Sequence, residues 1–182
     1  SVTSKARDNW SHYGYVGAEY NFSPDLTGSV RGGVQYVNFY NAPGNNSSVG
    51  PYVEASLKYL YTAGSYLEAG FRHAFNATDL ISSSGSSLTV GQESSVAYTS
   101  ISYRITPELT GSLLGTYQHS TFNGGLYDGM SDDLFLAGLN LAYRLNPHLS
   151  AEAGYNYDRA VSDIGWRGYL RNRVYLVVTA SY

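Results

Sequence analysis

The feature that most constrains this chain is an alternation of apolar and polar residues with a period of two, which its last twelve residues show most clearly. Within 171–182, alternate positions form an apolar row of Val174, Leu176, Val178, Ala180 and Tyr182. The residues between them are more polar, and this period is that of a β-strand. Strands of soluble sheets typically run about 5–6 residues. The length therefore favours a membrane-crossing strand over the edge strand of a soluble sheet.

The composition also fits strands that meet both lipid and water. Only 14% of the 182 residues are charged, whereas 19 are tyrosine and 20 are glycine. Tyrosine, apolar at one end and polar at the other, is typical of membrane interfaces. No run of about 18 apolar residues occurs, which excludes a transmembrane helix. The net charge of −3, without any run of Lys or Arg, argues against nucleic acid as a partner.

The same alternation recurs along the chain in pairs of long segments. It predicts strands at 10–22, 26–40, 49–61, 65–75, 92–105, 109–122, 132–145 and 149–160, in addition to the last one. Tight turns at 23–25, 62–65, 106–108 and 146–148 join them at one end, and long polar loops join them at the other. Within 92–105 the apolar positions change parity between Val96/Tyr98 and Ile101/Tyr103, which predicts a β-bulge.

Three of the tight turns share a local signature. Each has a tyrosine, a proline four positions after the tyrosine, and a leucine two positions after the proline. The turns around Pro24, Pro107 and Pro147 show it, and the turns recur about every 40 residues, a period to be weighed against known repeat folds. A propeller blade needs four short strands per repeat, whereas each repeat here holds two long ones. The repeat therefore predicts an up-and-down β-barrel.

The repeated hairpins, together with the ending Arg171-Asn-Arg-Val-Tyr-Leu176, resemble the C-terminal part of outer-membrane β-barrel porins of Gram-negative bacteria over nearly the whole chain. The resemblance implies an all-β fold, a transmembrane antiparallel barrel with short periplasmic turns and longer extracellular loops. It implies a place among the lipids of the bacterial outer membrane. It also implies that Tyr182 is the signal recognised by the barrel-assembly machinery.

The number of strands is the main departure from that pattern, because nine are expected here and single-chain bacterial barrels have an even number. The first and last strands would run in the same direction, so direct closure would need a parallel seam. We therefore expect either 8–10 strands or part of a larger barrel, completed by a missing N-terminal part or by other chains. We expect residues 1–9, which do not have the pattern of a signal peptide, to form an extracellular lead-in and residues 10–182 to form the barrel domain.

The two faces of the strands predict separate roles. Aromatic residues near the tight turns predict an interfacial girdle at the periplasmic rim, made of Tyr20, Phe22, Tyr59, Tyr61, Tyr103, Tyr143 and Tyr182. A second girdle would comprise Tyr36, Phe39, Tyr40, Tyr117, Tyr155 and Tyr157. The opposite face would line the lumen with Glu19, Arg31, Glu54, Lys58, Glu68, Arg72, Arg104, Gln118, Arg144, Glu152, Asn156, Asp158 and Arg173.

Three functions remain open at this point, of which a passive channel for small hydrophilic solutes or ions is the first. The second is a barrel filled by paired charges that anchors partner-binding surface loops, since about 8–10 strands leave little room inside. The third is an outer-membrane hydrolase using His119-Ser120 and Asp132-Asp133 near the long-loop rim. However, the parity of His119 points it toward lipid. We expect no enzyme, no cofactor and no metal site, because the histidines lack ligand spacing.

Overall fold

The computed structural model describes residues 8–41, 47–78, 83–84, 87–89 and 91–181, and its dominant element is one antiparallel sheet. The nine strands of this sheet are β1 (Trp10–Ser23), β2 (Leu26–Asn38), β3 (Ser47–Thr62), β4 (Ser65–Ala77), β7 (Gly91–Arg104), β8 (Leu109–Asn123), β9 (Ser131–Asn146), β10 (Leu149–Ser162) and β11 (Tyr169–Ala180). Their order in the sheet follows the chain. Nine strands in up-and-down order are thus confirmed for the described residues.

The long loops contain the remaining elements. Between β4 and β7, β5 (Ser83–Ser84) and β6 (Ser87–Leu88) form a separate small hairpin. A 3-10 helix, η1 (Gly125–Tyr127), lies between β8 and β9. Among the described residues, no helix has the length and hydropathy needed to cross a bilayer.

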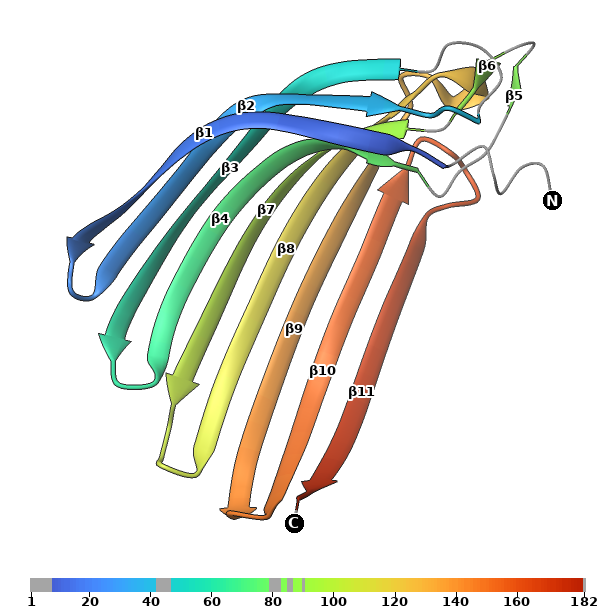
Figure 1. The fold of residues 1–182 in the computed structure, drawn as a ribbon. Coiled ribbons are helices and arrows are strands. Elements are labelled where there is room, and N and C mark those ends of the chain that lie inside the picture. The colour runs from blue at the N-terminus through green and yellow to red at the C-terminus, as the bar shows by residue number, and fades with distance from the viewer. Residues whose placement is uncertain (1–7, 42–46, 79–82, 85–86, 90, 182) are drawn as a thin grey trace.

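The sheet is curled and open, with β1 and β11 at its two edges (Figure 1). All short turns lie at one end, at the bottom of Figure 1, and the long loops lie at the other. Both edge strands run from the long-loop end to the short-turn end. Among the described strands neither edge has a second partner, so the sheet does not close on itself.

The ladder register assigns every strand residue to one of two faces, because residues directly opposite each other in antiparallel strands lie on the same face. One row crosses six neighbouring strands, from β4 to β11, and consists of Leu67, Ile101, Leu113, Leu139, Tyr155 and Val174. All but one of these six are large apolar side chains left strongly exposed. We call the face that carries this row the outer face and the opposite face the inner face.

The predicted bulge in β7 is wrong. The pairing of β7 is continuous with β4 on one side and with β8 on the other. Ile101 and Tyr103 therefore lie on the outer face, whereas Val96 and Tyr98 lie on the inner face. The parity seemed to change because two inward positions carry large apolar groups, and Tyr98 is there because its ring covers Gly70 on β4.

A side-chain amide replaces part of the ladder near the long-loop end of β4. The pairing of β3 with β4 ends at Val53, two residues after Pro51, which has no N–H to donate. Beyond that point, buried Gln35 of β2 reaches the backbone of Phe75. Its Oε1 accepts from the Phe75 N–H at 2.9 Å and its Nε2 donates to the Phe75 carbonyl at 2.7 Å. The glutamine amide thus acts as a peptide group that joins β2 to β4.

Buried apolar side chains gather at the long-loop end and are few. One cluster contains Val37, Phe39 and Phe75, and a second contains Phe122 and Ile164. Phe39 is only 2% exposed, so its predicted place in an interfacial girdle is wrong. Phe39 follows the last residue of β2 and packs against Phe75, with the two ring centroids 6.4 Å apart. Elsewhere most of the large exposed apolar groups lie on the outer face.

Candidate functional site

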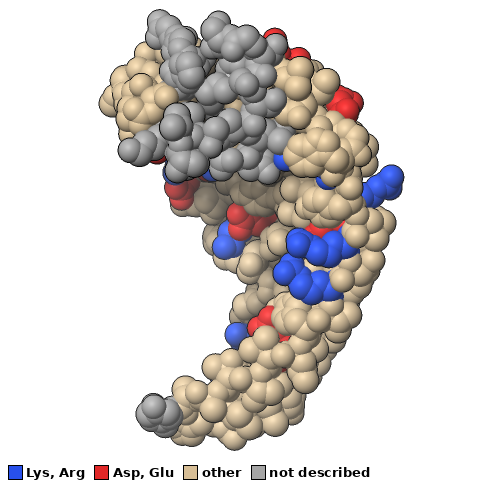
Figure 2. Space-filling model, turned by 90° about the vertical axis from the view of Figure 1, so that its right-hand side faces the viewer, with Lys and Arg blue, Asp and Glu red and all other residues tan. Residues whose placement is uncertain are grey.

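The predicted lumen residues all belong to the inner face. The register places Arg31, Glu54, Arg72 and Gln118 in one row across β2, β3, β4 and β8. A second row holds Lys58, Glu68, Asn156 and Arg173. The remaining candidates, Glu19, Arg104, Arg144, Glu152 and Asp158, share the same face. In Figure 2 the charged side chains gather mainly on the hollow side of the curled sheet.

Some of these inner charges are paired. Three ion pairs on this side join Arg31 with Glu54 at 3.8 Å, Arg171 with Asp158 at 2.5 Å, and Arg167 with Asp132 at 2.8 Å. Only the first of these pairs has both members among the predicted residues. The alternation would have placed Arg171 and Asp132 on this face, but their partners depend on the register and on the loop after β10.

Other inner charges are not paired with any described residue of opposite sign. Five cations of this kind, spread over β3, β4, β7, β9 and β11, are Lys58, Arg72, Arg104, Arg144 and Arg173. The Lys58 ammonium lies 4.6 Å from the centroid of the Tyr66 ring, and Arg144 makes one long contact of 3.5 Å to a backbone carbonyl. The described part of the inner face is therefore not filled by mutually neutralising pairs.

Two glutamates on this face are held by a repeated tyrosine–glycine arrangement that the sequence analysis missed. Tyr98 of β7 lies across Gly70 of β4, and its hydroxyl donates to Glu68 at 3.3 Å. The arrangement recurs between β10 and β11 with Gly154, Tyr175 and Glu152, at 3.1 Å. The repeated sequence Glu-Ala-Gly at 68–70 and 152–154 is a signal that could have revealed it.

The outer face carries an apolar band bounded by a polar belt. On β8 the outward residues from Leu109 to Tyr117 are apolar, glycine or aromatic over nine residues, and about 9–11 residues suffice to cross a bilayer core. Directly beyond Tyr117 toward the long loops lie polar groups on four neighbouring strands. This outer polar belt consists of His73, Glu93, Ser95, His119 and Asp133.

Aromatic side chains cluster at the short-turn end, where the sequence predicts one girdle. The ring centroids of Tyr20 and Phe22 are 5.1 Å apart, and Tyr61 stacks on Tyr103 at 6.1 Å. Tyr59 and Tyr143 are also exposed at this end. Tyr182, the predicted assembly signal, lies outside the described residues.

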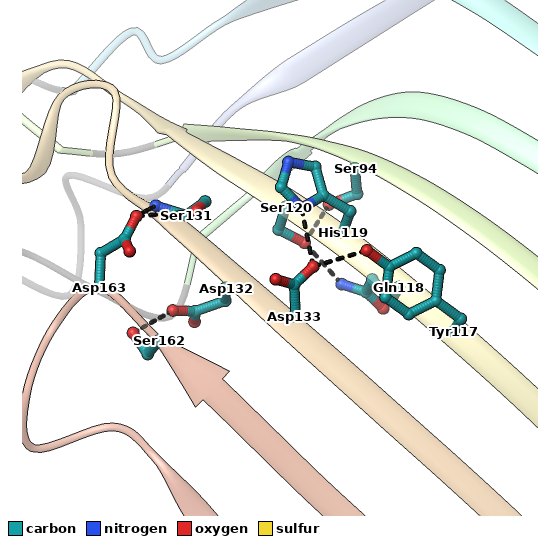
Figure 3. A network of polar contacts seen from close by, with 10 residues as sticks. All are labelled: Ser94, Tyr117, Gln118, His119, Ser120, Ser131, Asp132, Asp133, Ser162 and Asp163. Carbon is teal, nitrogen blue, oxygen red and sulfur yellow. Dashed lines mark hydrogen bonds and ion pairs between the residues drawn. The ribbon is translucent and has the colours of Figure 1, made fainter.

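The residues considered for hydrolysis lie on opposite faces of the sheet (Figure 3). His119 and Asp133 lie on the outer face, where His119 Nδ1 is 2.9 Å from the Asp133 carboxylate, which also accepts from the Tyr117 hydroxyl at 2.7 Å. Ser120 lies on the inner face and bonds to Ser94 at 2.9 Å. Adjacent residues of a strand point to opposite sides, so these groups do not converge.

One Ser/His/acid group does converge, on the outer face. His73 contacts Ser95 Oγ through Nδ1 at 2.8 Å and Glu93 through Nε2 at 2.9 Å. Acyl transfer also needs N–H donors for the oxyanion, whereas the backbone of β7 is engaged in ladders with both β4 and β8. The group therefore fits a polar tie between two strands better than a catalytic centre.

The loop after β10 is anchored to the start of β9. Ser131 donates its N–H and its hydroxyl to the Asp163 carboxylate at 2.9 and 2.8 Å (Figure 3). These hydrogen bonds, the hydroxyl one first, lower the pKa of Asp163 below its ordinary value. The anchored loop brings Trp166 and Arg167 to the inner side, and no sequence pattern had singled out either residue.

Comparisons with known proteins agree with this geometry. The family described as "Putative beta-barrel porin 2" matches residues 1–182. The chain belongs to this family. A solved structure described as "Copper transporter OprC" superposes with a TM-score of 0.66 at 13% sequence identity, covering 96% of this chain. At that identity the likeness concerns the fold alone.

The porin-family chain spans about a third of the length of that solved structure, since the match covers 34% of it. No curated protein matches the chain. Membership of the porin family, together with the fold, points to an outer-membrane location. The resemblance noted in the sequence is thus confirmed at the level of family and fold.

Proposed function

We propose that this chain forms part of the wall of a water-filled outer-membrane channel, through which small hydrophilic solutes or ions pass without an energy source. The observation that carries the proposal is that the charged residues of the strands lie mainly on the inner face, and that several of them have no ion-pair partner on the described part of that face. The inner face keeps several cations, among them Arg72 and Arg173, without an ion-pair partner in the described residues. An unpaired charge is costly in a dry interior, so water is its natural environment.

The direction of the edge strands supports closure by further strands. The edge strands β1 and β11 run in the same direction. An antiparallel barrel therefore needs an odd number of additional strands to close the gap from β11 back to β1. A ring of identical copies around the barrel axis would instead join β11 to a parallel β1. We infer that strands from another part of the polypeptide complete the barrel, with the short turns facing the periplasm and the long loops outside.

The chemistry of the site favours this reading over an enzyme. A channel needs a polar inner face and an apolar outer band, and both are built by the same alternation. Catalysis would need a nucleophile, a base and oxyanion donors that converge, and among the described residues the convergent group around His73 lacks the donors. We therefore propose no enzymatic activity for the chain.

Single-channel recording in a planar bilayer tests the proposal, with the detergent-folded polypeptide that includes the closing strands and a boiled sample as control. We expect resolved conductance steps that the boiled sample lacks. Under a KCl gradient, Arg72→Glu on the inner face should shift the reversal potential toward cations, because lumenal charges tune selectivity. Arg159→Glu is the matched control, because Arg159 lies on the outer face. This substitution should leave the reversal potential unchanged. A closed barrel that inserts and never conducts would refute the channel.

A further inference from the structure

A pocket at the long-loop end of the inner face has the composition of a binding site. Its volume is about 350 Å³, within the range of about 300–1,000 Å³ usual for small-molecule sites. The strands β7 to β9 form its floor, and the loop after β10 and the start of β11 form its wall. The residues that matter for recognition are Gln92, Gln118, Asp132, Trp166, Arg167 and Tyr169.

Two aromatic rings at the pocket remain open to solvent. Trp166 is 68% exposed and Tyr169 is 46% exposed. Neither belongs to the apolar outer band, because Tyr169 lies opposite Ala160 on the inner face and Trp166 precedes it in the anchored loop. The Arg167 guanidinium lies 5.8 Å from the Trp166 ring centroid. An exposed aromatic face next to polar groups suits a ligand that is itself apolar on one face and polar at its rim.

The two charged side chains on the inner side of the pocket cancel each other, whereas Asp133, which also lines the pocket, turns its carboxylate to His119 on the outer face. Arg167 donates to the Asp132 carboxylate through Nε at 2.8 Å, and its Nη2 lies 2.8 Å from the same oxygen. Asp132 also accepts from the Ser162 hydroxyl. Both members of the ion pair are largely shielded, with side chains 19% and 17% exposed. A fixed, neutralised pair offers hydrogen bonds without attracting an ion of either sign.

Two amides add hydrogen-bonding capacity. Gln118 donates from Nε2 to Ser120 at 2.9 Å, and Gln92 donates from Nε2 to Ser94 at 3.3 Å. The amide oxygens of both glutamines have no partner among the described residues. Because the serines fix the nitrogen ends, both oxygens are available as acceptors for hydroxyl groups.

Together these features lead us to propose that the pocket binds a neutral ring sugar, stacked on Trp166 and hydrogen-bonded by Gln92, Gln118 and the Asp132–Arg167 pair. The assignment rests on the proposed channel and names a solute class for it. A pyranose ring presents C–H groups on one face and hydroxyl groups around its rim, which matches the aromatic and amide groups of the pocket. The site lies where a solute from the long-loop side would first meet the inner face.

Tryptophan fluorescence tests the sugar site independently of conduction. The chain has two tryptophans, so Trp10→Phe leaves Trp166 as the sole reporter. In the folded full chain, maltotriose and cellobiose should each be titrated, and at least one should change the Trp166 emission saturably. Mannitol, an acyclic polyol with similar hydroxyl groups and no ring face, should produce no saturable change. An equal response to mannitol, or no response to either sugar, would overturn the assignment.

A pair of variants separates recognition from general effects on folding. Gln118→Leu should weaken sugar binding about tenfold, the loss expected for one hydrogen bond. Thr116→Val, two residues away on the same face of β8 and outside this pocket, should leave the affinity unchanged. Equal affinities for Gln118→Leu and the parent would refute the site. Sugar binding without conductance would refute only the channel, and conductance without sugar binding would refute only the sugar site.

Discussion

At the residue scale, glycine on the inner face makes room for the tyrosines that hold the glutamates. A Cβ at Gly70 would overlap the Tyr98 ring, and one at Gly154 would overlap the Tyr175 ring. The tyrosine covers the glycine and at the same time reaches a carboxylate two residues away on the same neighbouring strand. The arrangement therefore fixes the rotamer of the aromatic ring and the position of an inward charge together.

We expect Gly70→Ala to destabilise the chain by about 1–3 kcal/mol, the usual cost of overpacking. Gly50→Ala is the matched control, because Gly50 lies on the same face with no atom within 4 Å of its would-be Cβ, and it should be neutral or slightly stabilising. Urea titration of the chain folded in lipid bilayers measures both variants. Equal midpoints for the two variants would contradict the role given to the Tyr98 contact.

At the element scale, each long strand separates two environments. Leu139 and Leu114 have nearly the same exposure, 50% and 48%, but they lie on opposite faces of neighbouring strands. In a soluble protein two such residues would be equivalent. In a membrane the outer one meets hydrocarbon and the inner one meets water, so their substitutions should differ.

Leu139→Arg should therefore destabilise the folded chain by about 2–4 kcal/mol, as a charge does near the bilayer midplane. Leu114→Arg places the same charge on the inner face and should cost much less. The measurement is the free energy of unfolding of each variant in lipid bilayers. A larger loss for Leu114→Arg would mean that the inner face is the one in contact with lipid.

At the scale of the whole molecule, the open edges are the main consequence of an odd strand number. The outward backbone groups of β1 and β11 lack partners among the described strands, and unpaired edges are templates for pairing with further strands. The curl of the sheet and the polar hollow (Figures 1 and 2) fit a section of a larger closed wall. We therefore propose that strands beyond the nine close the wall.

Hydrogen exchange monitored by mass spectrometry should reveal these edges. In the 182-residue chain folded in detergent without the closing strands, peptides from β1 and β11 should exchange faster than peptides from β8 and β9, whose backbone groups are paired on both sides. Cross-linking of the same sample should show no ring of copies joined edge to edge. Protection of β1 and β11 equal to that of β8 would show that the edges are already paired.

The sequence by itself determined the strands, the tight turns and the face of each predicted lumen residue. These are local properties, because a two-residue period fixes the side of a strand and a proline fixes where a turn begins. Even so, the local rule misread β7, where Val96 and Tyr98 are large and apolar but face inward. It also misplaced Phe39, whose burial depends on its contact with Phe75 of another strand.

Only the tertiary structure decided which of these residues meet. The pairing of Arg171 with Asp158 requires the register between β10 and β11, and the pocket requires Gln118, Asp132 and Trp166 to come from three separate segments. A sequence pattern records the side to which a residue points and not its distance from residues on other strands. Those distances follow from register, curl and loop packing, which arise from contacts between segments far apart in the chain.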